Sequence, residues 1–132
     1  MVSKLEMVLK ELNTNGNFRA SLFSTSTGLV LASQKAENID ERVVAAMSSL
    51  LSDSAYKARE ELDLSNLSSM KIKFENDLII MQNIPMPEED NQFLLAILGR
   101  APESEEVEKY YDDLIQWALD NARDELRKLS SI

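Results

Sequence analysis

Apolar residues recur at helical spacing near both ends of the chain. Ser3 and Glu6 have the separation of a capping box, which predicts a helix over about residues 3–13. A second helix is predicted over about 104–129, because Pro102 breaks the chain before it and acidic residues crowd its first turn. The apolar positions of the first helix are Leu5, Val8, Leu9 and Leu12.

Between these helices, a β-hairpin and a longer helix are predicted. Residues 18–24 and 29–33 are β-prone runs, and Gly28 in the turn between them can take a positive φ. Asn38 has the capping separation from Glu41, and the stretch from there to about residue 62 contains neither glycine nor proline. This stretch predicts a central helix about 35 Å long at 1.5 Å per residue.

Three further strands are predicted in the second half. Residues 70–75 alternate apolar and charged side chains, the period of a strand with one buried face. Residues 78–81 and 93–98 are apolar on both faces, and 93–98 is expected to be central in the sheet. The stretch 85–90, with its two prolines and the acidic Glu88-Glu89-Asp90, predicts a solvated loop.

The predicted order is α-β-β-α-β-β-β-α over one domain, residues 1–132. Strands that are apolar on both faces need helices on each side of the sheet. The fold class predicted is therefore α/β, a three-layer α/β/α sandwich around a five-stranded antiparallel sheet.

This order of elements and the hydrophobic pattern of the hairpin, central helix and later strands resemble the roadblock/dynein light chain superfamily over residues 3–115. The chain departs from that pattern in the turn Ser24–Thr27, where members often carry an acidic residue, and in its longer last helix. The resemblance is to prokaryotic roadblock-type regulators of small GTPases. It implies a dimer that binds a Ras-like small GTPase, and it brings no catalytic signature.

Composition excludes most familiar active sites. The chain has no cysteine and no histidine, which removes thiolate catalysis, the commonest general base and the commonest metal ligands. It has no glycine-rich phosphate loop, and its net charge of −9 repels nucleic acid. No apolar run is long enough to span a membrane, and the first residues lack the pattern of a secretory signal. We expect a cytoplasmic protein that is not an enzyme, with no cofactor, no metal, no nucleic-acid partner and no membrane span.

A helical wheel divides the central helix into two faces. The apolar face is predicted to lie on the sheet, and it holds Val43, Val44, Met47, Leu50, Leu51, Ala58 and Leu62.

The opposite face carries small residues over about two turns, where a face turned to water more usually carries charged ones. Small residues let another backbone approach closely, so this face is predicted to contact a second subunit and a partner. On this prediction, Ser52→Arg dissociates the dimer and Tyr56→Ala weakens partner binding. The predicted interface residues on the helix are Ala45, Ser48, Ser49, Ser52, Tyr56 and Arg59, with Glu60 beside them.

The strand 70–75 is expected at the sheet edge, where it pairs antiparallel with its twin in a second subunit. A two-fold axis at Lys73 sets Lys71 opposite Glu75 of the twin, whereas an axis at Ile72 sets Lys71 opposite Lys73. The first register is favoured because it brings unlike charges together. Lys71, Lys73 and Glu75 therefore complete the predicted interface.

On the last helix, Tyr111 is predicted to be in the core, and Tyr110 and Trp117 are left open between core and interface.

The function hypothesis is a non-catalytic dimeric platform that binds and regulates a Ras-like small GTPase. The alternatives are a scaffold or light-chain subunit of a motor or signalling complex, a small-molecule sensor domain, or a carboxylate-based enzyme. A sensor requires a concave pocket with convergent polar groups.

Overall fold

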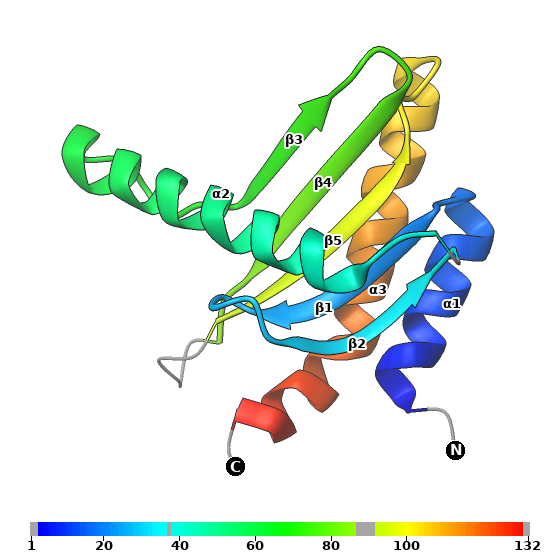
Figure 1. Ribbon diagram of the computed structural model, residues 1–132, viewed down its shortest axis with the longest axis horizontal. Helices are drawn as coiled ribbons and strands as arrows, with labels where there is room; N and C mark the ends of the chain where they lie inside the picture. The colour runs from blue at the N-terminus through cyan, green and yellow to red at the C-terminus, as the bar shows by residue number, and fades with distance from the viewer. Residues whose placement is uncertain (1–2, 37, 87–91, 131–132) are drawn as a thin grey trace.

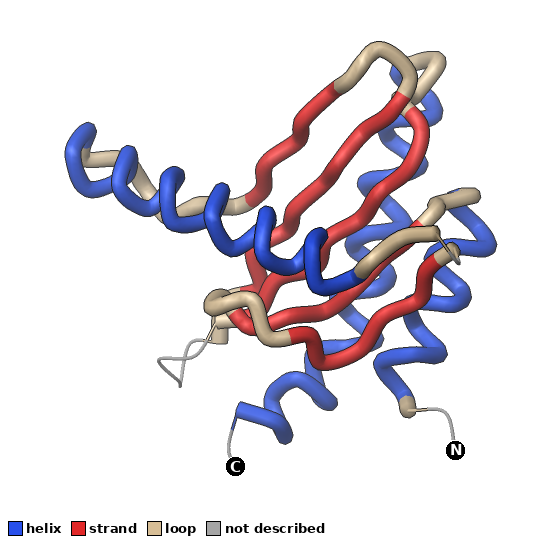
Figure 2. The backbone as a smooth tube through the Cα atoms, viewed as in Figure 1, coloured by secondary structure: helices blue, strands red, loops and turns tan. Residues whose placement is uncertain are grey.

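The computed structural model describes residues 3–36, 38–86 and 92–130. Its elements follow the predicted order and form a single antiparallel sheet in the spatial order β2-β1-β5-β4-β3 (Figures 1 and 2). They are α1 (Lys4–Gly16), β1 (Ala20–Thr25), β2 (Val30–Lys35), α2 (Glu41–Leu62), β3 (Ser69–Lys73), β4 (Asp77–Ile84), β5 (Phe93–Arg100) and α3 (Glu105–Ser130).

Helices cover both faces of the sheet, as predicted. Figure 1 shows α1 and α3 side by side on one face, with α2 crossing the other. The larger core lies under α1 and α3, where alternate residues of β4 and β5 meet the apolar faces of both helices. β5 is the central strand and β3 is an edge strand, which confirms both predicted positions.

One aromatic ring ties α1 to the centre of the sheet and to α3. The ring of Phe18 lies against two glycines, so close that an added Cβ at Gly16 or at Gly99 would come within 2.7 Å of a ring carbon. It packs edge-on against Tyr111, with ring centroids 5.0 Å apart. Tyr111 is buried, which confirms that prediction. These two glycines are needed because no larger residue leaves room for the ring.

The start of α2 differs from the prediction. Asp40, not Asn38, is the N-cap, and its side chain accepts a hydrogen bond of 2.9 Å from the backbone N–H of Arg42. Hydrogen bonds from the side chain and backbone of Arg42 hold the pKa of Asp40 below its usual value. The carboxylate of Glu41 also lies 3.2 Å from the Lys35 ammonium group. The motif that begins α2 is therefore an aspartate with its basic neighbour, not the longer capping pair.

Strand boundaries shift most around β3 and β4. β3 ends at Lys73, and Phe74 and Glu75 belong to the turn that follows it. β4 continues past the predicted residue 81 as far as Ile84, where Pro85 ends the pairing. Of the predicted loop 85–90, residues 87–90 and with them the acidic run lie outside the described residues. Among the helices described, none is both long and apolar enough to cross a membrane.

Candidate protein interface

The small residues of α2 face the chain's own sheet. Ala45 and Ser48 are the two buried residues of this helix, and Ala45 packs with Leu22 and Ala96 of the sheet. The Ser49 hydroxyl donates a hydrogen bond of 2.9 Å to the Ser26 carbonyl in the β1–β2 turn. The small face therefore forms the contact within the protomer.

The large apolar residues of α2 point to solvent. Val43 is 54% exposed, Met47 45%, Leu50 68% and Leu62 67%. The prediction that this face lies on the sheet is therefore wrong, and so is the placing of Ala45 and Ser48 on an outer surface. Of the predicted sheet-facing residues, Val44 packs on the small cluster around Ala45, while Leu51 and Ala58 are half-buried.

A close approach between α2 and the hairpin explains this orientation. Gly28 has a φ of +97°, which favours glycine, and it lies directly beneath the helix. A Cβ at this position would be 3.6 Å from the Cβ of Ser49 and 3.7 Å from the carbonyl oxygen of Ala45. Small side chains on the facing side of α2 allow this approach, because large ones there would hold the helix away from the sheet.

The free edge of β3 is the second open feature. Lys71 and Lys73 stand opposite Ile80 and Leu78 of β4, which belong to the core beneath α3. Alternation along the strand then turns Met70 and the other apolar residues of β3 toward the α2 side of the sheet. This edge carries backbone groups that no other strand in the described part of the chain pairs.

The charges on β3 change the predicted register. The ammonium group of Lys71 lies 3.0 Å from a carboxylate oxygen of Asp112 and 3.6 Å from one of Glu108, both on α3. Glu75 is in the turn beyond the strand. Because Lys71 already has carboxylate partners, the electrostatic reason for a two-fold axis at Lys73 no longer holds. The edge position of β3 remains.

The rest of the predicted helix surface lies around a small pocket. Ser52, Tyr56 and Arg59 line this pocket beside the end of β4, and Tyr56 is more than half exposed.

On α3, Tyr110 is exposed and Trp117 packs partly against the core. No group of three or more acidic side chains in the described ranges is arranged to hold a metal ion.

Four exposed apolar residues were not among the surface residues expected from the sequence: Val43, Met47, Leu50 and Leu62. The helical wheel groups them correctly on one face, so the grouping was available from the sequence. What was not available is the side of the helix that meets the sheet, because both a small face and a large apolar face can pack there. Gly28 in the β1–β2 turn allows the close approach of the helix, but the contact joins residues far apart in the chain and is seen only in the structure.

The fold and this open surface define a class: a small α/β/α domain with an edge strand at β3 and an apolar helix face turned outward. Residues 4–98 match the family model described as the Roadblock/LC7 domain. The chain belongs to this family.

Comparisons with individual proteins give a relative in sequence and several similar folds. It is 34% identical over 79 residues to the uncharacterized protein MJ0714 of Methanocaldococcus jannaschii, covering 60% of this chain and 67% of that protein. Its fold is similar to that of MglB from Myxococcus xanthus, with a TM-score of 0.79, 13% identity and coverage of 96% and 97% of the two chains. A Roadblock/LC7 domain from Streptomyces avermitilis has a TM-score of 0.78, with 15% identity and coverage of 95% and 99%.

Proposed function

We propose that this chain is a cytoplasmic, non-catalytic homodimeric platform that binds and regulates a Ras-like small GTPase. The observation that carries the proposal is the outward apolar face of α2. A large exposed apolar patch on a small domain is typical of a protein-binding surface.

The dimer is proposed to form through α2 and β3 together. Burying one aliphatic side chain fully is worth about 1.5–3 kcal/mol, so Val43, Met47 and Leu50 together can supply a substantial part of an association energy. The edge of β3 adds backbone groups that a second copy can pair by extending the sheet. In the chain, the end of α2 and the start of β3 are separated by only six residues. One continuous interface can therefore use both features.

The GTPase partner is supported by membership of the Roadblock/LC7 family and by the likeness of the fold to MglB. This support is an analogy of fold and family, which does not define a binding site. Of the interface residues expected from the sequence, Tyr56 and Lys73 are exposed. Tyr56 is retained here as a proposed contact of the GTPase, and Lys73 as a proposed contact between the two copies.

The test uses purified chain and each purified Ras-like small GTPase of the same organism, loaded with GDP or with a non-hydrolysable GTP analogue. We expect one GTPase to bind, with an affinity that depends on its nucleotide, and its hydrolysis or exchange rate to change when the chain is added. Binding without any effect on nucleotide turnover favours the scaffold alternative. Absence of binding to every such GTPase overturns the proposed partner.

A further inference from the structure

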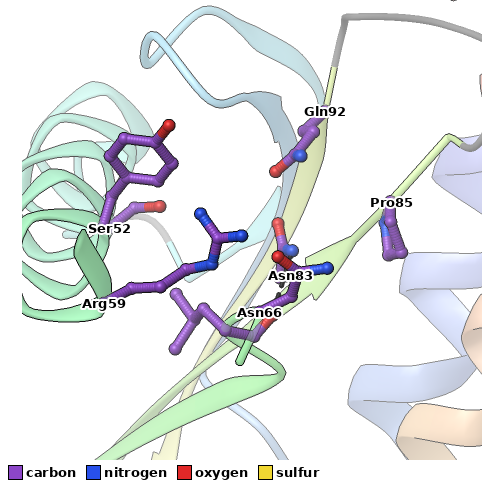
Figure 3. Close-up of a pocket in the computed structure, with 8 residues that line it drawn as sticks. Ser52, Arg59, Asn66, Asn83, Pro85 and Gln92 are labelled. Atoms are coloured by element: carbon purple, nitrogen blue, oxygen red, sulfur yellow. Dashed lines mark hydrogen bonds between the residues drawn. The ribbon is translucent and has the colours of Figure 1, made fainter. Parts of the chain in front are cut away.

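A pocket of about 110 Å³ opens between the C-terminal half of α2 and the sheet (Figure 3). Ser52 and Arg59 enter it from α2, Asn66 from the α2–β3 connection, and Gln92 from the residue just before β5. The connection is fixed to the sheet, because the Asn83 side-chain amide on β4 donates a hydrogen bond of 3.1 Å to the Leu67 carbonyl. The pocket is therefore a formed feature of the fold.

Among the described residues that line this pocket, Arg59 is the one charged side chain. Figure 3 shows its guanidinium group reaching from α2 into the space between Asn66, Asn83 and Gln92. Its Nε is buried and has no hydrogen-bond partner, and its Cζ lies 5.7 Å from the centroid of the Tyr56 ring. A buried donor on a charged group without a partner is costly, so this group calls for an anionic acceptor.

The size and charge of the pocket select the anion. Pockets for drug-sized ligands measure about 300–1,000 Å³, well above this one, which has room for a group the size of an acidic side chain. The other polar groups that described residues contribute to the lining are neutral hydroxyls and amides, including those of Ser52, Tyr56, Asn66 and Gln92. One guanidinium matches one carboxylate in charge and in its planar, two-pronged geometry. One guanidinium would neutralise only one of the two negative charges of a phosphate. The remaining charge would be repelled by a chain whose net charge is −9.

We propose that this pocket is a carboxylate-binding site in which the Arg59 guanidinium is the principal donor and neutral side chains of the lining complete the contacts. The carboxylate comes either from an aspartate or glutamate of a protein docked along α2 or from a small free acid. The site is defined by the protomer alone, so it does not depend on the proposed GTPase partner.

The test is an NMR titration that follows the Arg59 Nε–H signal of the isotope-labelled full chain. The first probe is glutamate whose amino group and main-chain carboxyl group are both converted to amides, so that only its side chain is charged. Glutamine blocked in the same way is the neutral match, and succinate represents a small free acid. We expect a saturable shift with blocked glutamate, with succinate or with both, and none with blocked glutamine. The acid that binds more tightly identifies the source of the carboxylate: blocked glutamate stands for a protein side chain and succinate for a free acid.

Variants show whether Arg59 is responsible. In Arg59→Gln, we expect the affinity for the acid to fall at least tenfold, as measured from the shifts of the backbone signals around the pocket. Arg59→Lys, which keeps the charge but loses the planar fork, is expected to bind at an intermediate strength, and it replaces Arg59→Gln in this comparison if that variant does not fold. Arg42→Gln, the same change at an exposed arginine near the start of α2, is the matched control and should bind as the unmodified chain does.

Three results would overturn the proposal. They are the absence of any shift with both acids, an equal shift with blocked glutamine, and acid binding that survives in Arg59→Gln.

Discussion

The two long helices of this domain use their apolar residues in opposite ways. α3 has eight buried residues among 26, its large aliphatic side chains meet the sheet and α1, and its charged residues face water. α2 has two buried residues among 22, both small, and its large apolar side chains are exposed. α3 therefore completes the core of the protomer, whereas α2 contacts the sheet through small residues and leaves its large apolar side chains exposed.

The comparison shows what an amphipathic pattern determines. On α3, one face is apolar and the other is charged, so only one orientation on a sheet is possible. On α2, the small face and the large apolar face can both pack against protein, and the pattern does not choose between them. The choice is made by the neighbouring backbone, where Gly28 beneath the helix favours the small face.

The largest effect on folding is expected in α3. Leu126 is fully buried, so Leu126→Ala removes core contacts and leaves a cavity, with an expected loss of about 2–5 kcal/mol in the free energy of unfolding. Urea denaturation followed by circular dichroism measures the change. Leu129→Ala, three residues further on at a side chain that is 41% exposed, is the matched control and should change the stability by less than about 0.5 kcal/mol. Equal losses at the two positions would contradict the assigned face of α3.

A smaller loss is expected when the tight side of α2 is enlarged. Ala45→Leu adds volume between the helix and the sheet, where Ala45 has no exposed surface, and should cost about 1–3 kcal/mol of protomer stability. The same substitution at the exposed neighbour Ala46 should be close to neutral, because that side chain faces away from the sheet. The comparison is made by thermal unfolding at low protein concentration. If Ala46→Leu is the more damaging of the two, α2 is turned the other way.

The smallest effect concerns the start of α2 and depends on pH. The pKa of Asp40 is held below its usual value of 3.8 by hydrogen bonds from Arg42, so the ionised carboxylate stabilises the folded state. This contribution is complete above the unfolded pKa and is lost as the pH falls through the lower folded pKa. The melting temperatures of the unmodified chain and of Asp40→Ala, measured across this range, should therefore converge on acidification. A difference that stays constant down to pH 2 would rule out this coupling.

The order of elements and the layers of the fold could be predicted from the sequence, because apolar spacing, caps and turn residues are local signals. The central place of β5 follows from apolar side chains on both of its faces, and the edge place of β3 from its charged alternation. The orientation of α2 could not be predicted, since it depends on a contact between Gly28 and Ser49, which lie far apart in the chain. The partners of Lys71 on α3 and the pocket around Arg59 also depend on contacts between distant segments.

The most direct test of the central claim places the same large charge on either side of α2. Leu50→Arg introduces an arginine on the exposed apolar face, and Ser52→Arg introduces one on the side that lines the pocket. The molar mass of the unmodified chain and of both variants is measured by sedimentation equilibrium over a range of concentrations. We expect the unmodified chain and Ser52→Arg to form dimers and Leu50→Arg to remain a folded monomer. For Ser52→Arg this reverses the expectation from the helical wheel, because Ser52 lines the pocket and Leu50 is on the exposed apolar face. A dimeric Leu50→Arg beside a monomeric Ser52→Arg, or an unmodified chain that is monomeric at every concentration, would contradict the claim that the apolar face of α2 joins two subunits.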